Sequence, residues 1–182
     1  MTTEYETRYA IGQQEAKGYD TQALRDAFLA DKLMQPGKIY WVYSHYERFM
    51  VGGAVPVETG LTLDTIDALK SACFTARREV GVINVGGAGT VQVDETTYAL
   101  EKGEALYIGA CVHNVTFYSD NGETPACFYL NSAPAHASYP CKKVGKDDAN
   151  VLHLGSPETA NQRDIHQLII NGVVETCQLQ MG

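Results

Sequence analysis

The sequence has no long apolar run. Although 45% of its 182 residues are hydrophobic, none of its apolar stretches approaches the roughly 18 residues that a membrane-spanning helix needs. The N-terminal stretch MTTEYETRYAIGQQEAKGYD is polar and lacks the apolar centre of a secretory signal. The sequence therefore argues against a membrane role and predicts a cytoplasmic protein.

The sequence also lacks paired cysteines. Its five cysteines are odd in number, widely scattered and never arranged as C-x-x-C, so they fit neither a disulfide framework nor a zinc knuckle. They are Cys73, Cys111, Cys127, Cys141 and Cys177. Because free cysteine behaves as a small hydrophobic residue, the sequence predicts reduced and partly buried thiols.

Positive charge is scarce in this chain. It has 14 lysines and arginines against 22 aspartates and glutamates, and its formal net charge is −8. There is no basic stripe beyond the pairs Arg77-Arg78 and Lys142-Lys143. A chain with this charge repels phosphate backbones, so we do not expect nucleic acid as a partner.

A nucleotide-binding fingerprint is absent as well, despite the glycines in RREVGVINVGGAGTVQVD (residues 77–94). A dinucleotide-binding fingerprint opens a helix and a P-loop ends in G-K-[ST], whereas this segment continues from its glycines as TVQVD. The alternation of TVQVD predicts a strand. We therefore expect a hairpin of GVINV and TVQVD, in which the glycines supply positive φ angles and clearance.

The first third of the chain contains one helix signal and one strand signal. DTQALRDAFLADK (residues 20–32) places its apolar residues on one face and can be capped by Asp20 or Thr21, which predicts a short amphipathic helix. Residues 39–45 are aromatic and β-branched, which favours a strand that ends before Gly52-Gly53. LTLDTIDALKSACF (residues 61–74) is compatible with a short helix or with a loop and a strand.

The rest of the chain predicts one all-β domain. Six short apolar or alternating runs are separated by turn residues: GVINV, TVQVD, TTYAL, EALYI, NVTFYS and ACFYL. Such runs without long helical crossovers indicate an antiparallel sandwich or barrel. DIHQLII and VVETCQLQ, separated by Asn171-Gly172, predict a final hairpin because Asn-Gly is a favoured two-residue turn.

Several motifs resemble the cupin family of double-stranded β-helix barrels. Glu79 precedes Gly86, and YALEKG then leads into the apolar strand of GEALYIGACVHNV. The resemblance implies a site where three histidines and a carboxylate bind a divalent metal. Here Cys73 and Thr75 stand where the family has its histidine pair, and His113 is one position short of the third histidine. We therefore expect a cupin-type barrel that binds no metal.

Longer stretches resemble a narrower family, the 4-deoxy-L-threo-5-hexosulose-uronate ketol-isomerases. They are YDTQALRDAFL, VYSHYERFMVGG, RREVGVINVGGAGTV, ALYIG, FYLNSAPAHASYPCKKV and ETCQLQMG, in the family's order. The resemblance implies a bicupin, commonly a hexamer, that acts in pectin degradation and interconverts 5-keto-4-deoxyuronate and 3-deoxy-D-glycero-2,5-hexodiulosonate. It also implies zinc, held by three histidines and a glutamate in the second barrel.

None of those four ligands can be matched in this chain. The resemblance thus implies that residues 1–182 form the N-terminal barrel of a bicupin, with a helical segment over about 1–35 and the barrel and final hairpin over 36–182. No metal is expected in this chain, and zinc belongs to the complete family protein. The alternative is a non-catalytic module for oligomer assembly or sugar-acid binding.

The candidate site residues are polar groups near the predicted strand ends. His45, beside Arg48, can contact a substrate carboxylate or carbonyl, or merely hydrogen-bond at a strand end. Arg77, Arg78 and Glu79 can form a charge cluster at the barrel mouth that suits a carboxylated sugar, or a solvated ion pair.

Two lysines complete the set of candidates. Lys142 and Lys143 follow Pro140 and can reach an anionic ligand, or they can be an ordinary surface pair. Among the remaining histidines, His136 lies in a loop-like stretch and can pack against Tyr139. His153 and His166 have no acidic or histidine neighbour at ligand spacing along the chain, so no role is assigned to them.

Overall fold

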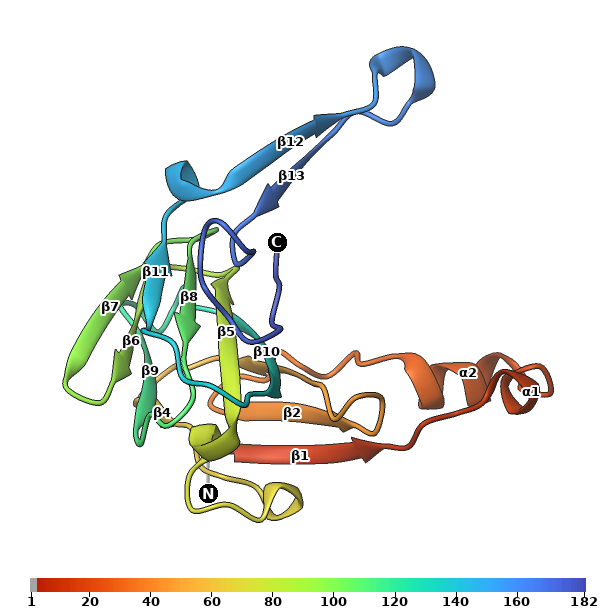
Figure 1. Ribbon diagram of the computed structural model, residues 1–182, viewed down its shortest axis with the longest axis horizontal. Helices are drawn as coiled ribbons and strands as arrows, with labels where there is room; N and C mark the ends of the chain where they lie inside the picture. Colours follow the sequence, from red (N-terminus) through yellow and green to blue (C-terminus); the bar gives the residue numbers. More distant parts are fainter. Residues whose placement is uncertain (1–2) are drawn as a thin grey trace.

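Two β-sheets facing each other form the body of the molecule, whose computed structural model describes residues 3–182 (Figure 1). The larger sheet has the order β1 (Thr3–Arg8), β2 (Ile39–Ser44), β3 (Met50–Ala54), β10 (Phe128–Pro134), β5 (Arg78–Asn84), β8 (Ala105–Ile108), β11 (Lys142–Val144). The smaller sheet has the order β4 (Leu61–Thr62), β9 (Val115–Ser119), β6 (Gly89–Val93), β7 (Thr96–Leu100). β12 (Asn150–Leu154) and β13 (Arg163–Gln167) pair with each other.

Helices are few and short. In the described residues, the two α-helices are α1 (Gln13–Ala16) and α2 (Thr21–Phe28), and the 3-10 helices are η1 (Asp67–Leu69), η2 (Phe74–Arg77), η3 (Lys146–Asp148) and η4 (Pro157–Thr159). No helix within residues 3–182 has the length and apolar character needed to cross a membrane.

The main core lies between the two sheets. Phe117 of β9 and Phe128 of β10 meet there with ring centroids 5.3 Å apart, and both are fully buried. Trp41 of β2 stacks on Phe74 at 4.9 Å. Side chains from both sheets thus fill one interior, as in the predicted all-β, cupin-type barrel, which is confirmed.

A second, smaller core covers the outer face of the larger sheet. In β5, Val80 and Val82 point into the main core, whereas the intervening positions point outward, because successive side chains of a strand alternate. The C-terminal segment, residues 168–182, packs over that outer face with Ile169, Leu179 and Met181. The barrel is therefore wrapped by its own C-terminal segment.

The predicted hairpin around the glycines is wrong. β5 pairs with β10 and β8, and β6 pairs with β7 and β9, so the GGAG segment carries the chain from one sheet to the other. None of its glycines has a positive φ. The expected need for space at these glycines is confirmed, because a Cβ on Gly87 would lie 2.1 Å from the carbonyl oxygen of Thr124.

The N-terminal segment differs from the prediction in one strand. The helix expected over residues 20–32 is present as α2, which Asp20 caps by accepting the N–H of Ala23 at 2.8 Å, and it ends at Phe28. The predicted helical segment of residues 1–35 also contains β1, which pairs parallel with β2 and is the exception to the antiparallel pattern. Met1 and Thr2 lie outside the described residues.

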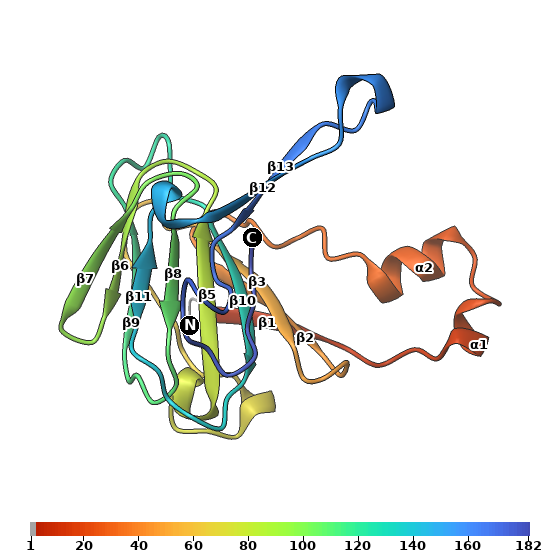
Figure 2. The same cartoon turned by 45° about the horizontal axis from the view of Figure 1, so that its top comes forward.

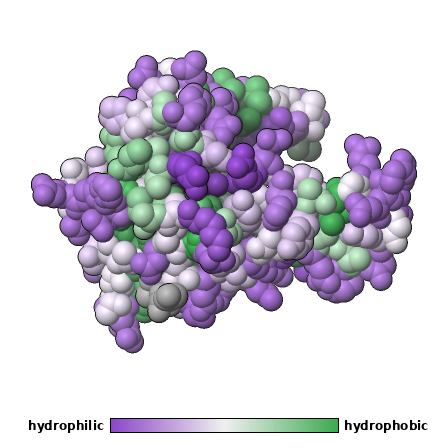
Figure 3. Space-filling model, turned by 60° about the horizontal axis from the view of Figure 1, so that its bottom comes forward, coloured by the Kyte–Doolittle hydropathy of each residue, from purple (hydrophilic) through white to green (hydrophobic). Residues whose placement is uncertain are grey.

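The two helices stand away from the barrel and present apolar side chains to solvent. Leu24, Phe28 and Leu29 are each more than a third exposed. Figure 3 shows hydrophobic atoms among hydrophilic ones on this projection.

The predicted C-terminal hairpin is also wrong. The strand expected at residues 164–170 is β13, whose partner is β12, and together they form an arm that projects from the barrel (Figures 1 and 2). The chain does reverse at Gly172, which has φ +95°. After it, only an isolated bridge joins Ile169 to Met181. The undecided residues 61–74 form the short β4 and η1, joined by loops.

Candidate functional site

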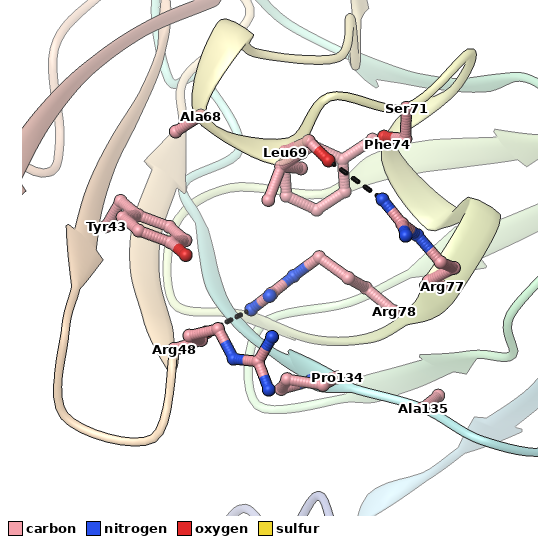
Figure 4. Close-up of a pocket in the computed structure, with 10 residues that line it drawn as sticks. All are labelled: Tyr43, Arg48, Ala68, Leu69, Ser71, Phe74, Arg77, Arg78, Pro134 and Ala135. Atoms are coloured by element: carbon pink, nitrogen blue, oxygen red, sulfur yellow. Dashed lines mark hydrogen bonds between the residues drawn. The ribbon is translucent and has the colours of Figure 1, made fainter.

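A cavity of about 300 Å³ opens at one end of the barrel and contains three arginines. The loop that carries η1 and η2, the turn between β2 and β3, and the end of β10 surround it. Figure 4 labels the ten residues that line the cavity. We call this cavity the arginine pocket, after Arg48, Arg77 and Arg78.

Arg78 is the central residue of the arginine pocket. It is the first residue of β5 and lies on the same inward face of the strand as Val80 and Val82. Its side chain therefore runs into the end of the barrel and is only 5% exposed. Its Nε donates to Ser132 Oγ at 3.0 Å, and its Nη2 donates to the carbonyls of Ser132 at 2.9 Å and Arg48 at 2.7 Å. The guanidinium is thus fixed by neutral oxygens.

The charge of Arg78 has no carboxylate beside it. No salt bridge of Arg78 occurs in the described part of the chain, and no aspartate or glutamate is among the residues that line the pocket. Burial lowers the pKa of Arg78 to about 10; the neighbouring Tyr43 partly opposes this lowering, and the nearby charge of Arg48 adds to it. Arg78 therefore remains a buried cation at neutral pH.

The other two arginines are exposed at the rim. Arg77 donates from Nη2 to the carbonyl of Leu69 at 3.1 Å, while Arg48 lies in the turn between β2 and β3. Glu47 and Arg48 have φ angles of 54° and 52°, a left-handed conformation that costs on the order of 1 kcal/mol per residue. Figure 4 shows Arg78 extending between Arg77 and Arg48.

Apolar and aromatic side chains form the remaining wall. Phe74 is buried and stacks on Trp41, and Leu69 lies beside it in the same loop. The hydroxyl of Tyr43 faces the pocket from β2 (Figure 4). The pocket thus combines a cationic side with an apolar side, which is the chemistry that binds an anion carried on a carbon skeleton.

Glu79 lies on the opposite side of β5 from the arginine pocket. Its carboxylate accepts the Tyr107 hydroxyl at 2.8 Å and the N–H groups of Cys177 at 2.9 Å, Gln178 at 2.9 Å and Leu179 at 2.8 Å. The predicted cluster of Arg77, Arg78 and Glu79 is therefore wrong, because neighbours in a strand point to opposite faces. Within residues 3–182, Glu79 forms no ion pair either.

The positions that correspond to the metal ligands of cupins do not all lie together. Cys73 Sγ and Thr75 Oγ1 both contact the carbonyl of Val112, next to His113, so three of the four positions are neighbours. Glu79 points away from them with its oxygens occupied. No group of three His, Cys, Asp or Glu that could hold a metal exists in the described residues.

The other predicted site residues lie outside the arginine pocket. The ring of His45 is 4.8 Å from that of Tyr9 and 5.6 Å from that of Tyr43, and Tyr43 lines the pocket. On β11, Lys142 Nζ donates to the carbonyl of Val173 at 2.6 Å. Lys143 Nζ pairs with Glu104 at 2.7 Å. Substrate contact by His45, Lys142 or Lys143 stays a prediction.

Sequence reasoning missed contacts that arise between strands. Ser132, which holds Arg78, lies 54 residues away along the chain and is brought close by the pairing of β5 with β10. His153 Nδ1 lies 2.6 Å from Asp164 Oδ1 across the β12–β13 ladder, although it has no acidic neighbour in sequence. The arginines themselves were a signal in the sequence for the pocket.

Comparisons with known proteins match nearly the whole chain. The model of the KduI/IolB family matches residues 29–182. The chain is 56% identical over 182 residues to a 4-deoxy-L-threo-5-hexosulose-uronate ketol-isomerase of Formosa agariphila, and 48% identical over 182 residues to one of Bacteroides thetaiotaomicron. Each alignment covers 100% of this chain and 65% of the relative. The chain therefore spans slightly less than two thirds of the length of these relatives.

A solved structure shares the fold. An IolB-like protein from Salmonella typhimurium LT2 superposes with a TM-score of 0.51 at 17% sequence identity, over 70% of this chain and 46% of that protein. At this identity the similarity concerns the fold alone.

Proposed function

This chain belongs to the KduI/IolB family, and from that membership we propose that it is the N-terminal barrel of a uronate ketol-isomerase. The enzyme would interconvert 5-keto-4-deoxyuronate and 3-deoxy-D-glycero-2,5-hexodiulosonate in the cytoplasm, in the breakdown of pectin and related uronates. The observation that carries the proposal is the 56% identity, over the full 182 residues, to a protein named for this activity. In line with the family, the complete protein would be a homohexamer.

The reaction is a proton shift between a ketone and an aldehyde. It needs a base that removes a proton next to a carbonyl, and an electrophile that stabilises the enediolate. In the complete protein, zinc in the second barrel would supply the electrophile, as the family resemblance implies. The cationic and apolar lining of the arginine pocket suits an organic acid, so we assign to this barrel the binding and positioning of the acid.

A second candidate function for the 182-residue chain alone is a non-catalytic module. It is favoured by Glu79, which holds the place of the metal-binding carboxylate in the cupin motif, because its carboxylate is used to fix residues 177–179. A barrel whose motif carboxylate has this structural use is suited to oligomer assembly or to sugar-acid binding. For this chain by itself we favour that function, and isomerase activity for the complete protein.

The test compares this chain with a version extended to the length of the relatives. Both are purified, their zinc content is measured by elemental analysis, and isomerisation of the unsaturated-uronate product is assayed with zinc supplied. We expect zinc and turnover in the extended version only. No turnover in the extended version would overturn the isomerase proposal, and stoichiometric zinc in the short chain would overturn the metal-free module.

A further inference from the structure

The arginine pocket contains a buried positive charge for which this chain supplies no counterion. Arg78 is 5% exposed, and its hydrogen-bond partners in the described part of the chain are all neutral oxygens of Ser132 and Arg48. Desolvating a cation is unfavourable unless an anion or a full set of hydrogen bonds compensates it. The guanidinium retains one nitrogen, Nη1, that donates to no group within residues 3–182. We propose that the arginine pocket binds the carboxylate group of a sugar acid, with Arg78 as its principal donor.

The donor is held in place before any ligand arrives. Ser132 is fully buried, and its hydroxyl donates to the carbonyl of Glu79 at 2.8 Å while accepting from Arg78. The Arg48 carbonyl holds Arg78 Nη2 from the other side. These contacts fix the plane of the guanidinium without neutralising its charge, so an incoming carboxylate meets a preorganised donor, the free Nη1.

The rim adds charge of the same sign. Arg48 and Arg77 are exposed and form no ion pair in the described part of the chain. No lining residue is acidic. In a chain with a net charge of −8, three clustered cations without a carboxylate form a local positive site that attracts a small anion.

The shape and the apolar wall favour an organic acid. Leu69 and Phe74 face the arginines, and such a wall contacts carbon atoms rather than a bare ion. The volume of about 300 Å³ is at the lower end of the range for small-molecule pockets, so it suits a single sugar acid rather than a polymer. The choice of a sugar acid among carboxylates rests on the proposed function, and the site itself rests on the pocket.

The test is calorimetric titration of the 182-residue chain with sodium galacturonate, galactose and inorganic phosphate. We expect saturable heat with galacturonate that weakens as salt is added, and none with galactose, which lacks the carboxylate. Equal binding of galactose and galacturonate would overturn the carboxylate site. Tighter binding of phosphate than of galacturonate would overturn the sugar-acid class and indicate a phosphate site.

Variants locate the binding within the pocket. Arg48→Gln and Arg77→Gln remove rim charges without touching the buried side chain, and we expect each to weaken galacturonate binding about tenfold. Lys102→Gln, an exposed cation outside the pocket, is the matched control and should leave affinity unchanged. An equal loss of galacturonate affinity in Lys102→Gln, or no loss of affinity in either arginine variant, would overturn the proposal. Arg78→Lys, checked for folding by thermal melting, should abolish binding.

A spectroscopic signal reports on the same site. The only tryptophan, Trp41, stacks on Phe74, which lines the pocket. Galacturonate should therefore shift Trp41 fluorescence with the affinity found by calorimetry, and a shift with a different affinity would contradict binding there. If galacturonate fails to bind while the extended version isomerises its substrate, this inference fails and the proposed function stands. If galacturonate binds but the extended version shows no turnover, this inference stands and the proposed function fails.

Discussion

Tyr107 donates its hydroxyl hydrogen bond to the Glu79 carboxylate over 2.8 Å, and both side chains are completely buried. The other acceptor positions of Glu79 take three consecutive main-chain N–H groups, those of residues 177–179. One buried carboxylate therefore joins β5 and β8 of the barrel to a segment about 100 residues further along the chain.

Replacing Glu79 by glutamine should loosen the C-terminal segment. The amide keeps the shape but has one acceptor oxygen instead of two, so buried N–H groups lose their partner. We expect the free energy of unfolding to fall by about 3 kcal/mol, measured by urea denaturation. The amides of residues 177–179 should also exchange faster with deuterium.

The matched control for Glu79 is Glu95→Gln. Glu95 is an exposed carboxylate in the turn between β6 and β7, and its replacement should change stability by no more than about 0.5 kcal/mol. Equal stability of the Glu79→Gln and Glu95→Gln variants would contradict the anchoring role of Glu79.

Stability should decline in alkali because of Tyr107. Burial, followed by the hydrogen bond and the charge of Glu79, raises the pKa of Tyr107 above its usual value of 10.0. The folded protein thus keeps a proton that the unfolded chain releases above pH 10.0, so the stabilisation is complete below that pH and is lost as pH rises. Unfolding free energies measured from about pH 8 to about pH 11 should show this decrease.

The Tyr107→Phe variant separates this effect from the titration of other tyrosines. It should be less stable than the parent by about 1 kcal/mol at neutral pH and should lose less stability in alkali. Tyr40 and Tyr98, whose pKa values are also raised by burial, remain and account for a residual slope. An unchanged alkaline slope in Tyr107→Phe would count against the prediction.

The connection between the two sheets should depend on Asn84. Its Nδ2 donates to the carbonyls of Gly87 at 2.7 Å and Leu100 at 2.8 Å, and its Oδ1 accepts the N–H of Gly86 at 3.1 Å. Asn84→Ala leaves these buried and half-buried groups without this partner and should cost about 2 to 3 kcal/mol in thermal or urea unfolding.

Gly87→Ala tests the close approach in the same connection. The added Cβ meets the Thr124 carbonyl oxygen at 2.1 Å, which a main-chain atom cannot relieve without moving the loop. We expect a loss of about 1 to 3 kcal/mol. Gly18→Ala, whose nearest neighbour would be 3.6 Å away, is the control that should cost nothing. Equal melting temperatures for the two alanine variants would refute the packing argument.

The five thiols should differ in reactivity. All are free, as the sequence predicted, and Cys111 is the exposed one. Burial raises the pKa of Cys141, which lowers its thiolate fraction. We expect a disulfide reagent to modify Cys111 in the first kinetic phase and Cys141 much later. The Cys111→Ser variant should lack that first phase, and its persistence there would contradict the assignment.

Local patterns predicted local structure well. Asp20 before an amphipathic run predicted α2 and its cap, and the alternating runs predicted strands that the structure contains. Strand pairing was harder to predict, because β5 and β10 pair at long sequence separation and β13 pairs with the strand before it instead of the segment after it. β1 was missed because TEYETR is mostly polar and gains its place from the parallel ladder with β2.

Part of the arginine pocket could be predicted from the sequence. The valines of β5 mark the residues that face the core, and the alternation of side chains along the strand then assigns Arg78 to the interior and Glu79 to the outside. Reading Arg78 and Glu79 as one cluster ignored this alternation. Ser132 and Phe74 could not be assigned to the pocket from sequence, because a fold must bring both of them to Arg78.

The β12–β13 arm rejoins the barrel at buried residues on both sides, Val144 before it and Leu168 after it, while most of its own residues are exposed. Its ladder can therefore open without exposing the core. Limited proteolysis would find its first sites near the tip, at η4, and leave two fragments that remain associated. The same tip is a position where an inserted peptide or label would leave the barrel intact.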